Sequence, residues 1–473
     1  MTSPLDLDYE TMRHLGTRVV EEVAQHLSTL RQQPAYSTLT RHEAERLVAG
    51  PAPEQGTDFE EILRFLRRNV FDHSALEPHP GFLAYVPSCP TFPAVLGDWL
   101  ATGFNSFGGA WSVAAGPNAV ELSVLDWFRT WVGFPPGSGG LLTSGGSAAN
   151  VTAMVAARHA AVQDQPGRIE RVTLYTSDQA HSSVVRAAWI AGVPRGNLRS
   201  IPVDAGYRMR ADLLARAVKE DRDRGLLPFS VVGSAGTTNT GSVDPLHAIA
   251  DIAGEFGLWF HVDAAYGGFA VLTDRGRALL DGIERADSVT LDPHKWLFVP
   301  FECGCLLARQ PRRLVDAFRI LPEYLRDVET GGEEINFADY GEQLTRYTRA
   351  FKVWVSVNYF GLGAIRSAID TGINLARHAE DLMRADPRFE ILSPAQLGII
   401  CFRVHPAGMD DPDRLNRLNE EINQRVVGAG RHFISSTRLD GRYSLRICVL
   451  GFRTTQEDIT DLIRSIAALS GER

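Results

Sequence analysis

The sequence predicts an α/β fold built around a mostly parallel sheet that is covered by helices on both faces. Between about residues 140 and 310, short runs rich in β-branched residues alternate with helical patterns such as Asp244–Phe256. Polar residues gather directly after these runs, which are Arg171–Thr176, Ser230–Ser234, Leu258–Val262 and Ser288–Leu291. Ligands of open α/β sheets bind at the carboxyl ends of strands, so the four polar segments predict one common site.

Three parts of the chain can be distinguished. Residues 1–88 are predicted to form a helical and extended N-terminal segment, residues 89–355 the large sheet domain, and residues 356–473 a smaller C-terminal α+β domain. Residues 9–32 place apolar side chains at helical spacing, namely Met12, Leu15, Val19, Val23, Leu27 and Leu30. This stripe predicts packing on another subunit or on the body of the chain, because a membrane-surface helix would need a basic face.

Composition and charge exclude several classes of function. The 473 residues carry a formal net charge of −9, which argues against a nucleic-acid or anionic-membrane partner. No apolar run approaches the roughly 18 residues of a membrane span, and no signal peptide is visible. The five cysteines are scattered without a CxxC pair, which predicts reduced thiols in a cytoplasmic protein, with no metal site and no disulfide framework.

Lys295 follows one of the predicted strands, in the run Asp292-Pro293-His294-Lys295-Trp296. It is one of only three lysines, against 45 arginines. An arginine stays charged, whereas a lysine amine can lose its proton and form a Schiff base. An unreplaced surface residue is a fair interpretation for Lys219, which lies in a charged run, but a poor one for Lys295 between His294 and Trp296.

Two further segments bear on the ligand. Thr143-Ser144-Gly145-Gly146-Ser147 leads into an alanine-rich helix, where glycines let the backbone approach an anion, although a plain turn capped by Ser147 is an equal alternative. The absence of a P-loop lysine and of GxGxxG argues against nucleoside triphosphates and dinucleotides. Asp263 ends the apolar run Leu258–Val262, where a carboxylate either pairs with a pyridinium nitrogen or caps a helix. A phosphate cradle, an acid and a lysine on successive strand ends together indicate pyridoxal 5'-phosphate (PLP).

At these positions the chain resembles the group II PLP-dependent decarboxylases, typified by aromatic-L-amino-acid decarboxylase. The resemblance covers nearly the whole chain and rests on His79-Pro80-x-Phe82-x-Ala84-Tyr85, Thr143–Ser147, Ser177-Asp178-Gln179-Ala180-His181-Ser182-Ser183, Gly236-Thr237-Thr238, His261-Val262-Asp263-Ala264-Ala265-Tyr266 and Pro293–Trp296. It implies the PLP-dependent transferase fold type I, which is aspartate aminotransferase-like. It also implies a homodimer with a shared active site, in which the N-terminal segment packs on the partner subunit.

The resemblance assigns roles around the cofactor. Lys295 would form the Schiff base, Asp263 would pair with the pyridine nitrogen, and His181 would stack on the ring, where a capped loop histidine is the alternative. Other cofactor-binding residues are Gly145, Gly146, Ser147, Thr238, Ala265 and Asp292. Asp292 departs from the animal aromatic enzymes, which carry Asn. A carboxylate is unfavourable beside a phosphate, so hydrogen bonding to backbone N–H groups is a second role for Asp292.

The resemblance also implies the reaction. The substrate amine displaces Lys295, CO2 leaves, and the cofactor holds the carbanion as a quinonoid. Tyr324 and His294 are the candidates that return a proton to Cα as general acids. Tyr324 lies in the polar segment 322–341, which is predicted to be a lid or disordered. Family members with Tyr here are decarboxylases and relatives with Phe are oxygen-consuming aldehyde synthases, whereas without the family a surface-loop tyrosine would be the better interpretation.

Substrate preference depends on a third group of residues. The resemblance places Tyr85, Val86, Pro87, Ser88 and Phe107 around the side-chain pocket, with ordinary core packing as the alternative. Thr345 stands where plant relatives use Gly for indole and Ser for phenol substrates, which favours a phenolic or smaller side chain.

The predicted activity is therefore decarboxylation of an L-amino acid of the aromatic type. Three rivals are a decarboxylase of an acidic or small amino acid, for which Arg346 and Arg349 are nearby basic groups, an aldehyde synthase, and an inactive relative that acts as a binding protein. The intact set of Lys295, Asp263, His181 and Tyr324 argues against the last.

Overall fold

A seven-stranded sheet forms the centre of the large domain in the computed structural model, which describes residues 3, 5–162, 166–320 and 334–470. Its strand order is β1-β7-β6-β5-β4-β2-β3. β7 runs antiparallel to both of its neighbours and the other pairs are parallel, so the predicted mostly parallel sheet is confirmed. The strands are β1 Gly139–Thr143, β2 Val172–Ser177, β3 Leu198–Ile201, β4 Leu227–Ser234, β5 Trp259–Asp263, β6 Ser288–Leu291 and β7 Gly304–Ala308.

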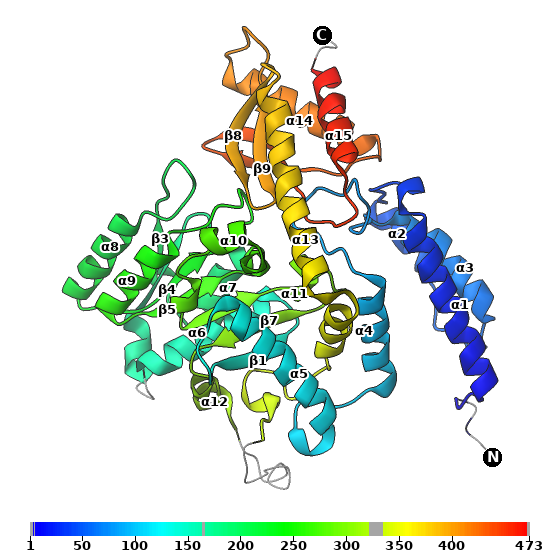
Figure 1. Ribbon diagram of the computed structural model, residues 1–473, viewed down its shortest axis with the longest axis horizontal. Helices are drawn as coiled ribbons and strands as arrows, with labels where there is room; N and C mark the ends of the chain where they lie inside the picture. The colour runs from blue at the N-terminus through cyan, green and yellow to red at the C-terminus, as the bar shows by residue number, and fades with distance from the viewer. Residues whose placement is uncertain (1–2, 4, 163–165, 321–333, 471–473) are drawn as a thin grey trace.

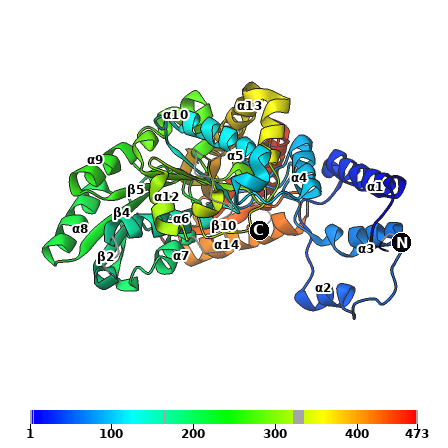
Figure 2. The same cartoon turned by 90° about the horizontal axis from the view of Figure 1, so that it is seen from below.

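Helices cover both faces of this sheet (Figures 1 and 2). The helices of this part of the chain are α4 Phe92–Phe104, α5 Trp111–Val132, α6 Gly146–Val162, α7 Ser182–Ile190, α8 Ala211–Asp223, α9 Leu246–Phe256, α10 Asp274–Leu279, α11 Pro293–Trp296 and α12 Arg312–Phe318.

Strand β5 shows how the two faces differ, because successive side chains of a strand point to opposite sides. The ring of Phe260 lies with Ile249 of α9 beside Gly233 on one face. His261 bonds a side chain of α6 on the other face. Strands buried on both faces explain the nearly continuous apolar run that the sequence has here.

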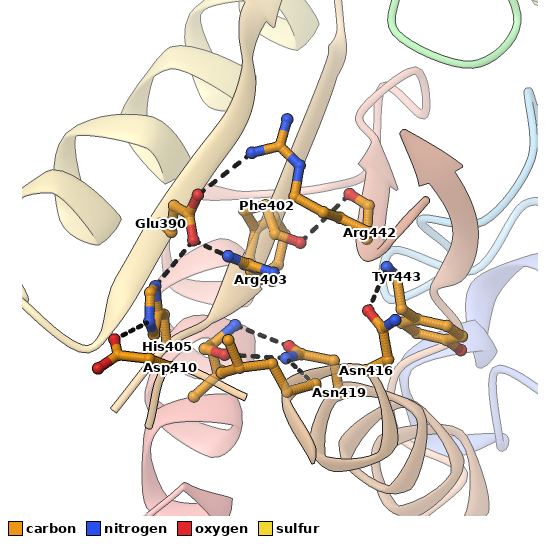
Figure 3. Close-up of polar contacts among 12 residues, drawn as sticks. Glu390, Phe402, Arg403, His405, Asp410, Asn416, Asn419, Arg442 and Tyr443 are labelled. Carbon is orange, nitrogen blue, oxygen red and sulfur yellow. Dashed lines mark hydrogen bonds and ion pairs between the residues drawn. The ribbon is translucent and has the colours of Figure 1, made fainter. Parts of the chain in front are cut away.

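A four-stranded antiparallel sheet with the order β10-β11-β9-β8 forms the C-terminal domain. Glu390 of β8 ties this sheet together, because its carboxylate accepts hydrogen bonds from Arg403 (2.6 Å), His405 (2.9 Å) and Arg442 (3.4 Å), as Figure 3 shows. The elements are β8 Phe389–Gln396, β9 Ile399–Val404, α14 Pro412–Gly428, β10 Ser435–Leu439, β11 Arg442–Cys448 and α15 Gln456–Leu469.

The long helix α13, Ala350–Arg384, links the two domains (Figure 1). The predicted domain boundary at residues 355–356 falls inside this helix. Its regular backbone is broken at Gly361, whose φ of 74° lies in the left-handed region that glycine tolerates best. The division of the chain into domains stays a prediction, and the helix α13 extends across its boundary.

The N-terminal helices α1 Tyr9–Ser28, α2 Arg41–Val48 and α3 Phe59–Asn69 lie to one side of the body of the chain (Figures 1 and 2), and α1 meets α4 where Gly16 faces the ring of Trp99. None of the three contains a buried residue. Ion pairs between Arg18 and Glu60 and between Arg67 and Glu22 connect α1 to α3. Within the ranges that the structure describes, no helix is long and apolar enough to cross a membrane.

Candidate active site

A cavity of about 360 Å³ opens at the carboxyl ends of β4, β5 and β6. The four polar segments predicted to meet there all contribute to it, which is the arrangement expected for parallel strands. Its lining consists of Ser144, Gly145, Gly146, Ser147, Ala148, His181, Ser183, Ser234, Gly236, Thr237, Thr238, Asp263, Ala265, Tyr266, Asp292, His294 and Lys295. The described residues therefore place every predicted cofactor-binding residue in this one cavity.

Lys295 reaches the cavity from the short helix α11. Its Nζ lies 2.8 Å from Oδ2 of Asp292, the residue that precedes this helix. Asp292 is only 3% exposed, and its Oδ1 has no hydrogen-bond partner among the described residues. The second role predicted for Asp292, bonding to backbone N–H groups, is not seen in the described part of the chain. Instead, its carboxylate holds the ammonium of Lys295 at the cavity wall.

The glycine segment forms the start of helix α6, directly beside Lys295. A Cβ on Gly146 would lie 3.0 Å from both Ala265 Cβ and Asp292 Oδ2, so a larger residue would press into the wall. Ser147 is exposed in the first turn and lines the cavity. The unpaired N–H groups at this helix start, together with the helix dipole, make it suited to a phosphate.

Asp263 stands at the end of β5 and is largely buried. Its Oδ1 accepts a hydrogen bond of 3.2 Å from the backbone N–H of Ala265, and its Oδ2 accepts one of 3.0 Å from Nδ2 of Asn150. A carboxylate with this support can face a cationic ring nitrogen without being left unpaired. The segment after Asp263 is a turn and not an α-helix, so the alternative of a helix cap fails here.

His181 is the residue before helix α7, and it lines the cavity as well. Its Nδ1 accepts the backbone N–H of Ser183 at 3.2 Å, so the capped-histidine interpretation and the cavity position both hold for this residue. Thr238 contributes to the opposite wall, where its carbonyl oxygen accepts hydrogen bonds from Nε (3.1 Å) and Nη2 (2.7 Å) of Arg446.

His294 is buried beside Lys295 and packs against the ring of Phe301. Burial lowers the pKa of its imidazole below the ordinary value. The Nδ1 atom lies 2.7 Å from the carbonyl oxygen of Cys303 and 3.3 Å from the backbone nitrogen of the same residue. The shorter contact, to a carbonyl that can only accept, favours a proton on Nδ1. The neutral ring therefore presents Nε2 to the cavity as a proton acceptor.

The six candidates for substrate binding do not line this cavity of the single chain. They are Tyr85, Val86, Pro87, Ser88, Phe107 and Thr345. Ser88 is buried and donates its hydroxyl to the carbonyl of Val299. Tyr85 lies near the rim, because Arg446 bonds the carbonyl oxygens of both Tyr85 (2.7 Å) and Thr238. Tyr324, the predicted proton donor, lies outside the described residues.

Two residues of this region were not singled out from the sequence. Asn150 lies four residues after Gly146 on the same helix, and this spacing places both on one helix face. That spacing was visible in the sequence, but the burial of the amide was not. Arg446 lies on β11 of the other domain, about 200 residues from Thr238, and only the fold brings the two together.

These groups fit PLP. The cavity offers a lysine amine for the aldehyde, a supported carboxylate for the ring nitrogen, an imidazole for the ring face, and a helix start for the phosphate. A Cβ at Gly146 would crowd Ala265 and Asp292, so a glycine fits best at this point of the helix start.

Comparison with known proteins identifies the family. The model of the pyridoxal-dependent decarboxylase conserved domain matches residues 42–405. Aromatic-L-amino-acid decarboxylase of Bacillus atrophaeus is 40% identical over 100% of this chain and 98% of the relative. Phenylacetaldehyde synthase of Petunia hybrida is 31% identical over 94% of this chain and 91% of the relative.

Solved structures agree with the sequence relatives. The Oryza sativa structure described as TDC with PLP and tryptamine has a TM-score of 0.94 at 29% identity, and covers 100% of this chain and 99% of its own. Tryptophan decarboxylase of Catharanthus roseus, in complex with L-tryptophan, has a TM-score of 0.93 at 27% identity, with 99% and 100% coverage. The predicted fold type I and the predicted cofactor are thereby confirmed. The chain belongs to the pyridoxal-dependent decarboxylases and is a PLP-dependent carboxy-lyase.

Proposed function

We propose that this enzyme converts an aromatic L-amino acid into the corresponding amine and CO2. The observation that carries the proposal is the convergence of Lys295, Asp263 and His181 on one cavity. The end-to-end similarity to an aromatic-L-amino-acid decarboxylase supports the aromatic class of substrate. Relatives named as tryptophan and tyrosine decarboxylases, at 32% and 31% identity, point the same way.

Five residues of the cavity have a proposed task toward the cofactor. When bound, PLP supplies an electron sink for the pair left on Cα as CO2 departs. Lys295 provides the amine that holds the cofactor, and Asp263 keeps a proton on the ring nitrogen. His181 lies against the ring face, and the start of α6 with Gly146 and Ser147 holds the phosphate.

Protonation of Cα needs an acid, and we assign this task to Tyr324. His294 fits the opposite role, because its neutral ring presents an unprotonated Nε2 to the cavity. His294 can thus receive a proton from the substrate ammonium, whereas it could donate one only after being protonated against its lowered pKa.

The charges of the cavity support an uncharged substrate side chain. Among the described lining residues, the lysine that binds the cofactor is the only Lys or Arg. Arg346 and Arg349, the basic residues that could favour an acidic substrate, do not line the cavity and pair with Glu121 and Glu302. Within the part of the site that one chain supplies, a substrate carboxylate in the side chain would therefore lack a cationic partner.

A homodimer is part of the proposal. The helices α1 and α3 expose apolar side chains and bury none, and the exposed set includes Tyr9, Met12, Val19, Ile62 and Phe65. A second copy that covers these faces would remove that apolar surface from water. Sedimentation at micromolar concentration should give twice the monomer mass of 52.0 kDa. A monomer that remains fully active would contradict the proposal.

A cytoplasmic location is also proposed. All five cysteines are free and buried, as in proteins of reducing compartments. Fractionation of the source cells with an antibody against the protein would test this, and recovery outside the cytoplasm would contradict it.

Mass spectrometry of the products tests the function directly. Purified enzyme loaded with PLP is incubated with Phe, Tyr, Dopa, Trp, His, Glu or Asp, and a Lys295→Ala variant serves as the inactive control. An amine from the aromatic set supports the proposal. Amine from Glu or Asp alone would overturn the substrate class, while aldehyde with hydrogen peroxide would identify an aldehyde synthase, the activity named for the Petunia relative.

A further inference from the structure

Asn150 connects the two groups that are proposed to hold the cofactor ring. It lies in the second turn of α6 and is 1% exposed. Its Nδ2 is 3.0 Å from Oδ2 of Asp263 and 3.0 Å from Oγ of Ser183. Both hydrogens of the amide are therefore used, one toward the carboxylate and one toward the hydroxyl next to His181.

The orientation of this amide follows from its neighbours. An ionised carboxylate only accepts hydrogen bonds, so the NH2 group of Asn150 must face Asp263. Its Oδ1 then faces the opposite way, where it accepts from Oγ1 of Thr290 at 2.7 Å and from Nε2 of His261 at 3.0 Å.

On the side of Asn150 that faces the sheet, the hydrogen bonds of buried strand residues fix the orientation of its amide. Burial lowers the pKa of His261 to about 4, so its ring is neutral, and the proton is on Nε2 where Asn150 accepts it. Its Nδ1 accepts the hydroxyl of Ser288 at 2.8 Å, and that hydroxyl oxygen accepts Nε1–H of Trp259 at 2.8 Å. Each donor along this route has an acceptor.

On the side of Asn150 that faces the cavity, the same order of donors and acceptors continues through Ser183 to His181. Since Oγ of Ser183 accepts from Asn150, its own proton points to Nδ1 of His181 at 2.8 Å. The backbone N–H of Ser183 donates to the same atom. With Nδ1 accepting twice, the ring proton of His181 stays on Nε2.

We propose that Asn150 is a positioning residue that sets both the orientation of Asp263 at the edge of the cofactor ring and the tautomer of His181 at its face. The amide does so by joining the two groups to one directional set of hydrogen bonds, which begins at Trp259 in the buried sheet. The inference rests on the proposed placement of the ring between Asp263 and His181.

Cofactor binding by Asn150→Ala and Asn150→Asp tests the proposal. Titration of apoenzyme with PLP, followed by quenching of tryptophan fluorescence, should give a Kd raised roughly tenfold to a hundredfold, the size expected for losing a hydrogen bond to a charged group. At saturating PLP, the circular dichroism band of the bound cofactor should also change, because that signal depends on how the ring is held.

Asn419→Ala is the matched control. Asn419, on α14 of the C-terminal domain (Figure 3), is equally buried and holds both backbone groups of Val404 on β9, and it does not line the cavity. It should lower the melting temperature while leaving the Kd and the dichroism band unchanged. Ser183→Ala provides a milder change, because it removes the hydroxyl that joins Asn150 to His181 while the backbone N–H of residue 183 still donates to Nδ1 of His181. It should alter the band with a smaller effect on the Kd.

The outcomes distinguish the proposed role of Asn150 from the proposed placement of the cofactor ring, on which it rests. Wild-type Kd and band in both the Asn150 and Ser183 variants, alongside a large loss of affinity in Asp263→Asn, would refute the role of Asn150 alone. Wild-type binding in Asp263→Asn would refute the placement of the ring itself. If the Asn150 variants fail to fold, the band of Ser183→Ala decides, and an unchanged band would overturn the proposal.

Discussion

Breaking the buried ion pair between Arg346 and Glu121 should cause a large and measurable loss of stability. The two side chains are 1% and 3% exposed, and Nη2 of Arg346 lies 2.7 Å from Oε1 of Glu121. The same guanidinium donates to the carbonyl of Leu142, and the same carboxylate accepts the N–H of Leu142, at the end of β1 before the glycine segment. Arg346→Met leaves the carboxylate buried without its counter-charge, which costs about 3–5 kcal/mol. That is a large share of the roughly 5–15 kcal/mol that stabilises a typical domain.

Urea unfolding monitored by tryptophan fluorescence, at fixed enzyme concentration, measures this loss. Glu121→Leu should be similarly damaging, and the double variant Arg346→Met/Glu121→Leu should lose less than the sum, because neither charge is then left unpaired. Arg41→Ala is the control, since Arg41 and Glu45 form an exposed pair whose loss should cost under about 1 kcal/mol. Strictly additive effects, or an Arg346→Met variant as stable as Arg41→Ala, would show that the pair does not act as argued.

Three further outcomes are expected. Lys295→Ala should lose the visible absorbance of bound PLP and all decarboxylation, whereas Lys219→Ala should keep both; a yellow and active Lys295 variant would refute its assignment. Tyr324→Phe should shift the product from amine toward aldehyde with hydrogen peroxide, and unchanged amine formation would mean that another group donates the proton. The pKa of His261, lowered to about 4 by burial, means that the unfolded chain binds the additional proton as the pH falls from about 6.5 toward 4. Stability is therefore lost as the pH falls through that window, by at most about 3 kcal/mol. His261→Gln should reduce the difference between the unfolding free energies that urea titrations give at pH 7 and at pH 4.5. An identical difference would show that His261 does not titrate on unfolding.

The strands and the cofactor-binding residues could be predicted from short stretches of sequence. The apolar run before Asp263 needs both faces of a sheet to bury it, and this pattern is present in five consecutive residues. Because parallel strands end at one edge, Asp263 and Lys295 could be placed together without knowing any contact between them.

Contacts between distant segments could not be read in the same way. The link between Arg446 and Thr238 joins two domains, and no local pattern distinguishes Arg446 from the other 44 arginines. Asn150 looked like an ordinary helix residue, because its significance depends on which strand side chains face α6. The ion pair of Asp292 with Lys295 was also missed, since the direction of a carboxylate at a helix start depends on the fold around it.

The positions of the substrate candidates add a separate argument for a second subunit. Tyr85 belongs to a group beside Thr238, held there by Arg446. Phe107 and Thr345 belong to another, because the N–H of Gly108 donates to the carbonyl of Arg346 at 3.0 Å and so places segments 107–109 and 344–346 side by side. Neither group lines the cavity of its own chain. Tyr85 is 62% exposed, and its backbone is held at a φ of 50°, which is unfavourable for a non-glycine residue. A twofold interface can bring one group from each copy to the same cavity, and the exposed apolar faces of α1 and α3 require a covering surface as well. The proposed dimer would therefore account for both the substrate pocket and the exposed faces of the N-terminal helices.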